Sequence, residues 1–248
     1  MEAVTRRTCL AMGAAPVVAA GVAAYATRGV WEGAGRPRFA RPEPAREALQ
    51  QRHLPNVPLV THDGRAVRFY DDLVRDKKVV LSFISSRAPR ESAKVRHNLG
   101  AIQRLFGDRV GSEMFLYSIA RDPERDTADA LKSWAVWSGA GPGWTFLSGR
   151  EADVDTLRRS LGFGSDDPVE DADPAVAVGV IRYGTEPEMR WGHCQSQAEA
   201  RVIAHSLLLD FGLGNADPRS PVAKKFGTGA SPDGAPVWNC QLLLQGVA

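Results

Sequence analysis

The chain has 248 residues, of which 44% are hydrophobic and 24% charged, and its 31 basic side chains nearly balance 29 acidic ones for a net charge of +2. This length and composition predict one globular domain with appendages, large enough to bury a substantial core. The basic residues are scattered along the chain. Because a nucleic-acid-binding protein concentrates positive charge, we expect no nucleic acid partner.

Residues 1–27 predict a targeting segment. Arg6 and Arg7 stand before an uncharged stretch, residues 8–27, that is rich in Ala and Gly. The arginine pair resembles a twin-arginine export signal, and Ala24 and Ala26, on either side of Tyr25, form the small-x-small site that a signal peptidase cuts. The alternative is membrane attachment through residues 8–27, since about twenty uncharged residues can span a bilayer. We therefore expect an exported protein, either periplasmic or membrane-anchored and facing the periplasm, with cleavage left open.

Residues 28–53 contain several Pro and Arg residues and few aliphatic ones, which predicts a tether with little reason to pack. The pattern changes at Leu54. Two short apolar runs within residues 54–69 flank Asp63 and Gly64. An Asp-Gly pair between such runs is a strong signal for a β-hairpin.

Residues 79–84 form a short apolar run, which is typical of a buried central strand. Small and turn-forming residues then interrupt it, and Pro89 begins a helical pattern that ends near Phe106. Proline suits a first helical turn because the N–H group that it lacks would be unpaired there. Thioredoxin-like proteins carry a reactive cysteine at such a turn, where the helix N-terminus lowers the pKa of the thiol. This turn contains no cysteine.

The same patterns predict the remaining elements. They are a strand at 113–120, a helix at 128–138 capped by Asp126 or Thr127, a short strand within 143–149, a helix at 151–163, strands at 175–183 and 188–192, and a helix at 198–211 that buries Val202, Ile203, Leu207 and Leu208. Alternating strands and helices predict an α/β domain over residues 54–212. Residues 213–248, rich in Gly, Pro, Ser and Asn, are expected to form a C-terminal tail.

Several of these segments resemble the Sco/SenC family of thioredoxin-fold copper chaperones. The most specific likeness is a string between a strand and a helix, Asp122, Pro123, Glu124, Arg125, Asp126 and Thr127, and the hairpin and residues 143–149 add to it. The resemblance implies a thioredoxin-like α/β fold with a central mixed sheet flanked by helices and an N-terminal hairpin. It also implies a role in copper or thiol chemistry during the assembly of cytochrome oxidase.

The residues at the family's ligand positions lack the family's chemistry. Laid on the pattern Cys-Pro-x-x-Cys-Pro, Phe83 and Pro89 match, but the cysteine positions fall on Ala88 and Ser92. The histidine position falls near Pro174, and no histidine occurs between residues 97 and 193. Cu(I) favours sulfur, which alanine and serine cannot supply. We therefore expect a degenerate member with no cofactor, no metal and no catalytic residue, which binds a partner and is not an enzyme.

Alternatives remain in the rest of the chain. His193 and Cys194 are an adjacent imidazole and thiol, so a replacement metal site there would allow a copper chaperone or thiol–disulfide oxidoreductase with non-standard ligands. Cys194 could instead form a disulfide with Cys240 in an oxidising compartment.

The turn before Pro89 is also the expected binding surface. Ser86, Arg87 and Arg90 surround a helix N-terminus, where a protein partner or a small anion could bind. By resemblance, the partner would be a membrane respiratory complex or another copper- or redox-dependent enzyme. The protein would then be an accessory or assembly factor, or alternatively a permanent subunit of one complex.

Overall fold

The computed structural model describes residues 43–213, 229–230 and 236–237. The expected targeting segment, the start of the expected tether and most of the expected tail lie outside these residues. Within the described part of the chain, no helix combines the length and the hydropathy that crossing a membrane requires.

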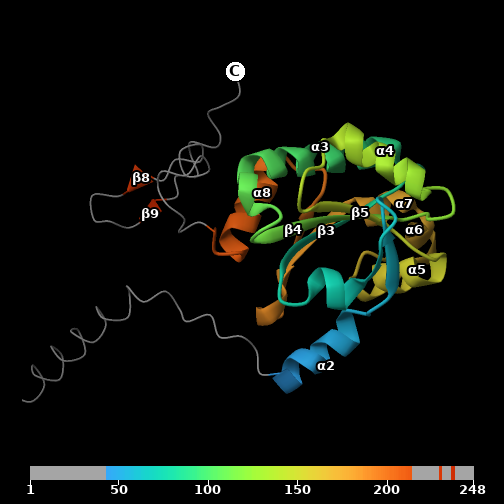
Figure 1. The fold of residues 1–248 in the computed structure, drawn as a ribbon, viewed down its shortest axis with the longest axis horizontal. Coiled ribbons are helices and arrows are strands. Elements are labelled where there is room, and N and C mark those ends of the chain that lie inside the picture. Colours follow the sequence, from blue (N-terminus) through green and yellow to red (C-terminus); the bar gives the residue numbers. More distant parts are fainter. Residues whose placement is uncertain (1–42, 214–228, 231–235, 238–248) are drawn as a thin grey trace, which may run out of the picture. The chain divides into compact units, whose positions relative to one another are not determined.

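A seven-stranded mixed sheet forms the centre of the fold (Figure 1). Its spatial order is β2-β1-β5-β4-β3-β6-β7. Neighbours β3, β4 and β5 are parallel, whereas β1, β6 and β7 pair antiparallel to the strands beside them. The strands are β1 (Pro58–Thr61), β2 (Ala66–Arg68), β3 (Lys78–Ile84), β4 (Met114–Ala120), β5 (Trp144–Ser148), β6 (Val180–Thr185) and β7 (Arg190–Gln195). A separate pair consists of β8 (Gly229–Ala230) and β9 (Pro236–Val237).

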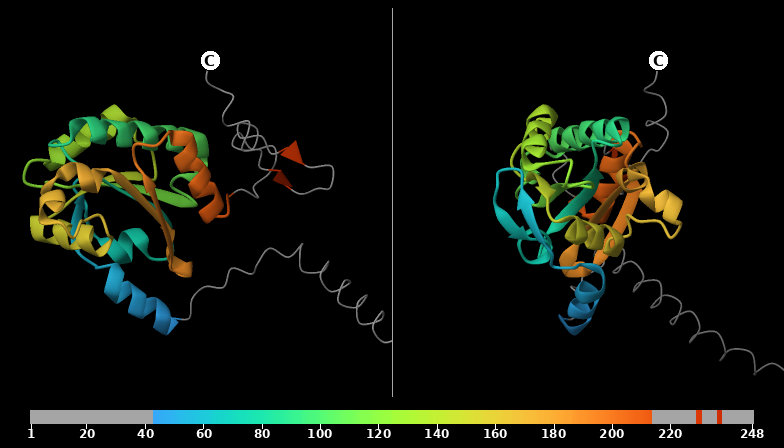
Figure 2. Two further views of the ribbon diagram at one scale, coloured as in Figure 1. Left: turned by 180° about the vertical axis from the view of Figure 1, so that it is seen from behind. Right: turned by 90° about the vertical axis from the view of Figure 1, so that its right-hand side faces the viewer.

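Helices cover both faces of the sheet (Figure 2). The α-helices are α2 (Glu43–His53), α3 (Pro89–Phe106), α4 (Ala128–Ser138), α5 (Glu151–Ser160), α6 (Pro168–Ala172), α7 (Pro174–Val178) and α8 (Ala200–Asp210). A π-helical turn spans Phe69–Val74, and short 3-10 turns span Gly107–Arg109 and Glu186–Glu188.

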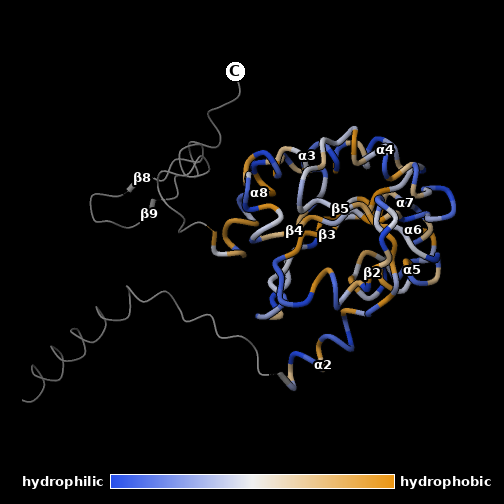
Figure 3. The backbone as a smooth tube through the Cα atoms, in the orientation of Figure 1, coloured by the Kyte–Doolittle hydropathy of each residue, from blue (hydrophilic) through white to orange (hydrophobic). Residues whose placement is uncertain are grey.

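Strand β3 is buried on both faces and separates two apolar cores. Val80 and Ile84 face the core formed with α3, α4 and α8, while Val79, Leu81 and Phe83 face the core formed with Phe69–Val74 and α5. Side chains alternate between the faces of a strand, so a continuous apolar run is what a strand buried on both sides requires. Figure 3 shows hydrophobic residues concentrated along the central strands and hydrophilic residues along the outer helices.

Most elements near β3 match the sequence predictions. The hairpin is confirmed as β1 and β2, with Gly64 at φ +85° in the turn. Strands at 79–84 and 113–120, the helix that begins at Pro89 and the helix at 128–138 are also found. Of the two proposed caps for α4, Thr127 is the N-cap, and its hydroxyl accepts from the N–H of Ala130 at 3.5 Å.

The structure differs from the expected tether over Glu43–His53, which form α2. Arg46 in this helix donates from Nε to the Glu186 carboxylate at 2.8 Å, and the Glu186 side chain is fully buried. Composition could not reveal this packing, because the partner of Arg46 lies 140 residues away in the sequence. Helix α2 is therefore packed against the domain.

The expected strand at 175–183 is wrong in its first half. Residues 174–178 form α7, and the strand begins at Val180. The Asp173 carboxylate caps this short helix by accepting from the N–H of Ala175 at 2.9 Å. A short apolar run does not distinguish a strand from a buried helical turn, which explains the error.

The face of the last helix was also partly mispredicted. Ile203, Leu207 and Leu208 are buried as expected, but Val202 is 56% exposed. The strand expected at 188–192 instead spans Arg190–Gln195.

Candidate functional site

The candidate site is the turn between β3 and α3, which we call the β3–α3 turn and define as residues 85–92. It leaves the carboxyl end of the central strand, at the edge of the sheet where α/β proteins usually place their sites. Because β3 and β4 are parallel, with Ile84 opposite Ala120, the segment 122–127 leaves the sheet beside this turn. Two motifs that are 30 residues apart in the sequence therefore meet at one edge.

Ser92 holds the turn closed. Its hydroxyl accepts from the N–H of Ser85 at 2.9 Å and donates to the carbonyl of Ser85 at 2.8 Å. The Ser92 side chain is fully buried, so these two hydrogen bonds are shielded from water. Ser92 thus joins the first turn of α3 to the end of β3.

Two carboxylates from segment 122–127 bind the other side of the turn. Asp126 is buried, and its oxygens accept from the N–H of Ser86 at 3.2 and 3.3 Å. Burial raises the pKa of Asp126, and the hydrogen bonds from Ser86 oppose this rise. Asp122 accepts from the Ser85 hydroxyl and from the Arg87 guanidinium, the latter at 3.3 Å.

These contacts occupy the N–H groups in the first half of the turn, from Ser85 to Ala88. The N–H of Ser85 binds Ser92, that of Ser86 binds Asp126, and that of Arg87 binds the Ser85 hydroxyl at 3.0 Å. The N–H of Ala88 reaches the Ser85 carbonyl at 3.3 Å. An anion bound at these N–H groups would have to displace the carboxylate of Asp126 or the hydroxyls of Ser85 and Ser92.

Ala88 and Pro174, at two of the family's ligand positions, are part of the packed interior. Ala88 is 4% exposed and belongs to the core beside α3, in the same apolar cluster as Ile84 and Val178. Pro174 is buried at the start of α7, and α7 packs against α3 and β3. Neither side chain offers an atom that could ligate a metal or attack a substrate.

The outer surface of the turn is polar and exposed. Ser86, Arg87, Pro89 and Arg90 are all exposed, and Arg87 is paired with Asp122. The turn therefore presents a serine and two guanidinium groups at the surface, while Ser92 and Asp126 hold its main chain from the buried side by hydrogen bonds.

The alternative metal site at His193 and Cys194 is not supported by the geometry. Successive residues of a strand point to opposite faces of a sheet. Cys194 lies opposite Ile181 and packs against the core, whereas His193 lies opposite Arg182 and is exposed. Burial raises the pKa of the Cys194 thiol to about 11, so the metal-binding thiolate is disfavoured at neutral pH. Cys240, the other half of the expected disulfide, lies outside the described residues.

Within the described ranges, no three residues of the types His, Cys, Asp and Glu are grouped so that they could hold a metal ion.

The structural role of segment 122–127 was missed at the level of the sequence. The string was singled out for its family likeness and as the source of a cap for the helix at 128–138, but not as a partner of the turn before Pro89, although both motifs directly follow apolar runs. If the strands before the two motifs had been predicted to be parallel neighbours, both motifs would have been expected at the same edge of the sheet. The signal available in the sequence was that carboxylates follow one strand and serines follow the other.

The chain was compared with family models, curated proteins and solved structures. No family model and no curated protein matches it, whereas solved structures with a similar fold were found. A putative electron transfer protein from Aquifex aeolicus is similar over 63% of this chain and 94% of its own, with 17% identity and a TM-score of 0.50. Copper-bound ScoI from Arabidopsis thaliana (18% identity, 63% and 96% covered, TM-score 0.49) and copper-bound yeast Sco1 (15%, 75% and 99%, TM-score 0.49) are also similar. With its mixed sheet flanked by helices, the chain has an α/β thioredoxin-like fold. Sco proteins are among the solved structures that are similar to it.

Proposed function

We propose that this protein is an exported, Sco-like thioredoxin-fold factor that acts by binding a protein partner, without thiol or copper chemistry. Its client would be a membrane respiratory complex or another copper- or redox-dependent enzyme, which it serves as an accessory or assembly factor. The surface that binds the client is the exposed side of the β3–α3 turn, with Ser86, Arg87 and Arg90.

One observation carries this proposal: the groups that replace the family's ligands are committed to holding the turn. The Ser92 hydroxyl makes two hydrogen bonds to Ser85, and Ala88 is packed in the core. The Ser92 hydroxyl donates its proton to the carbonyl of Ser85, and no side-chain base is hydrogen-bonded to it within the described residues, whereas a nucleophilic serine requires such a base. The turn therefore supports a rigid recognition surface better than a reactive centre.

Charge gives this surface its specificity. Arg87 and Arg90 are exposed and lie three positions apart; Arg87 is paired with Asp122, and no ion pair of Arg90 is found within the described residues. Fixed guanidinium groups favour a partner surface that carries carboxylates, because complementary charge speeds encounter and excludes partners of like charge. We expect an acidic patch on the client.

The experiment is co-purification of the tagged protein with its client from gently solubilised membranes. The test variant is Arg87→Glu with Arg90→Glu, which reverses the charge beside the turn. The matched control is Arg65→Glu with Arg75→Glu, two exposed arginines at the opposite edge of the sheet, where β3 begins.

We expect the test variant to recover at least about tenfold less client than the wild type, and the control variant to recover as much as the wild type. Equal recovery by both variants would show that the client binds elsewhere. If no client protein co-purifies with the wild type, the proposed binding role itself is wrong.

A further inference from the structure

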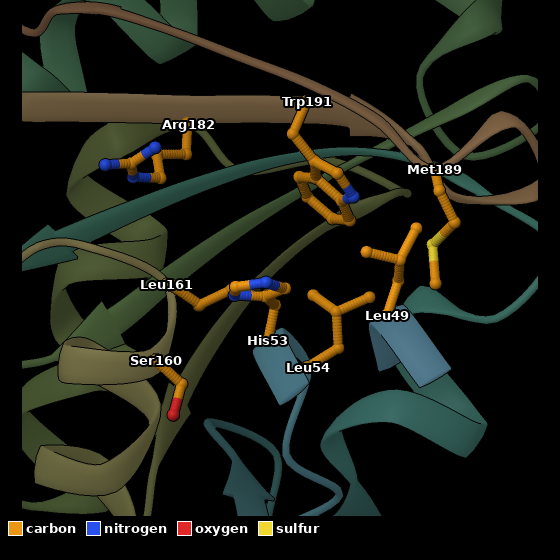
Figure 4. A pocket seen from close by; sticks show the side chains of 8 residues that line it. All are labelled: Leu49, His53, Leu54, Ser160, Leu161, Arg182, Met189 and Trp191. Atoms are coloured by element: carbon orange, nitrogen blue, oxygen red, sulfur yellow. The ribbon is translucent and has the colours of Figure 1, made fainter. Parts of the chain in front are cut away.

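A cavity lies on the other side of the sheet from α3. It has a volume of about 250 Å³ and lies between α2, α5 and the hairpin of β6 and β7 (Figure 4). Its apolar lining belongs to the core that α5 shares with Leu81 and Phe83, not to the core of the β3–α3 turn. The lining residues are Leu49, His53, Leu54, Ser160, Leu161, Arg182, Met189 and Trp191.

Arg182 brings a positive charge to this cavity without a carboxylate partner in the described part of the chain. Its Nη2 donates to the carbonyl of Gly162 at 2.7 Å, and its guanidinium lies 5.7 Å from the centre of the Phe163 ring. Its Nε is buried and finds no partner. Partial burial lowers the pKa of Arg182, which is the cost of holding this charge among apolar groups.

The backbone makes room for this arginine. A Cβ atom added to Gly162 would lie 2.5 Å from Nη2 of Arg182, so any larger residue would displace the guanidinium. Gly162 also has φ +69°, which glycine adopts without strain. The position of Arg182 is therefore built into the end of α5 and the turn that follows it.

Trp191 forms the wall of the cavity in a similar way. A Cβ atom on Gly184, which lies opposite Trp191 on the neighbouring strand, would lie 2.5 Å from two carbons of the indole, so the ring occupies the space that a side chain at position 184 would need. Figure 4 shows the indole, Met189 and Leu49 lining one side, with the His53 ring reaching in from the end of α2. Helix α2 closes this side, because Arg46 ties it to the buried Glu186.

The lining contains one guanidinium, one imidazole, one hydroxyl and no acidic side chain. An apolar cavity with a single unpaired positive group at its edge matches a molecule with an apolar body and one negative group. Guanidinium binds carboxylates through two parallel hydrogen bonds, which suits a carboxylate at this position. A volume of 250 Å³ is at the small end for ligand sites, which excludes a nucleotide or a long lipid chain.

We propose that this cavity binds a small apolar monocarboxylate. The carboxylate pairs with Arg182, and the apolar body lies against Trp191, Met189 and Leu49. The site is independent of the β3–α3 turn, so the ligand would tune or stabilise the protein from the opposite face of the sheet.

The test uses phenylacetate as the probe and its uncharged relative 2-phenylethanol as the comparison, added to the isotope-labelled protein and followed by NMR. Among the six tryptophans, the indole N–H signal of Trp191 is identified with the variant Trp191→Phe. We expect phenylacetate to shift this signal saturably and to bind at least about tenfold more tightly than the alcohol, because only the carboxylate pairs with Arg182.

Arg182→Gln should weaken phenylacetate binding about tenfold and abolish the preference over the alcohol. The matched control is Arg75→Gln, which removes an exposed arginine outside the cavity and should leave binding unchanged. The proposal is wrong if phenylacetate does not saturate, if the alcohol binds equally well, or if the shifts map to the β3–α3 turn. The comparison of the two probes on the wild type decides the question even where Arg182→Gln does not fold.

Discussion

The hydroxyl of Ser92 binds both main-chain groups of Ser85, accepting from its N–H at 2.9 Å and donating to its carbonyl at 2.8 Å. The two residues are seven positions apart, at the end of the central strand and in the first turn of α3. The side chain at a position where the resemblance expects a copper-binding thiol is thus an internal clamp.

Ser92→Ala removes this clamp and leaves the buried N–H of Ser85 without its partner. We expect a loss of about 1–3 kcal/mol in the free energy of unfolding, measured by chemical denaturation. Cellular function should persist, as judged by complementation of a deletion strain at a temperature where the variant is folded. Ser133→Ala, which removes an exposed helical hydroxyl, is the control and should change stability by about 0.5 kcal/mol or less.

A null phenotype for Ser92→Ala, in a variant shown to be folded and exported, would mean that this hydroxyl takes part in chemistry. Because Ser92→Thr keeps a hydroxyl but changes the shape of the side chain, rescue by this variant would then show that the hydroxyl is the group that function requires.

Asp126→Asn tests the buried carboxylate that holds the turn. Burial raises the pKa of Asp126 above the ordinary value of about 3.9. Between that value and the raised one, the folded chain binds more protons than the unfolded chain, so the free energy of unfolding falls as pH rises through this window. The asparagine variant lacks this contribution, and its oxygen can still accept from the N–H of Ser86.

The measurement is chemical denaturation of wild type and Asp126→Asn at a series of acidic to neutral pH values. We expect the stability of the variant relative to wild type to improve as pH rises. Asp129→Asn, at an exposed position in the first turn of α4, serves as the control for added amide. Parallel curves for wild type and Asp126→Asn would show that Asp126 does not titrate with a raised pKa.

Arg46→Met tests whether α2 is part of the domain. The Glu186 carboxylate is fully buried and keeps hydrogen bonds from the Tyr70 hydroxyl and the N–H of Asp76, both at 2.8 Å. Without Arg46 its charge is unpaired, which costs about 3–5 kcal/mol in comparable sites. Arg52→Met, an exposed change at the end of the same helix, should cost about 0.5 kcal/mol or less.

Combining Arg46→Met with Glu186→Gln removes both charges and should recover much of the lost stability. If Arg46→Met and Arg52→Met lower the free energy of unfolding equally and only slightly, residues 43–53 are not packed against the domain and belong to the tether that composition indicated.

Export is expected to depend on the arginine pair near the N-terminus. Changing Arg6 and Arg7 to Lys keeps the charge but removes the pair that the twin-arginine route reads. We expect the precursor to accumulate in the cytoplasm, measured by fractionation and immunoblotting. A single Arg28→Lys change, beyond the uncharged stretch, is the control. Normal export of the double variant would indicate a general secretory signal or a membrane anchor.

Sequence reasoning worked where structure is local. The strand at Lys78–Ile84 and the helix that begins at Pro89 follow from an apolar run and a proline, and both were placed within about a residue. The contacts that matter most could not be predicted in this way. Arg46 finds Glu186 across 140 residues, and Ser86 finds Asp126 across 40. Only the fold brings these partners together.

The measurement that tests the central claim most directly is Cu(I) binding under reducing conditions, in competition with a chromogenic Cu(I) chelator. The variant Ala88→Cys with Ser92→Cys is the positive control, because it restores two thiols at the start of α3. We predict that the wild type leaves Cu(I) with the chelator at equal concentrations, while the double-cysteine variant withdraws it. Tight stoichiometric binding of Cu(I) by the wild type would contradict the claim that the protein acts only by binding a protein partner.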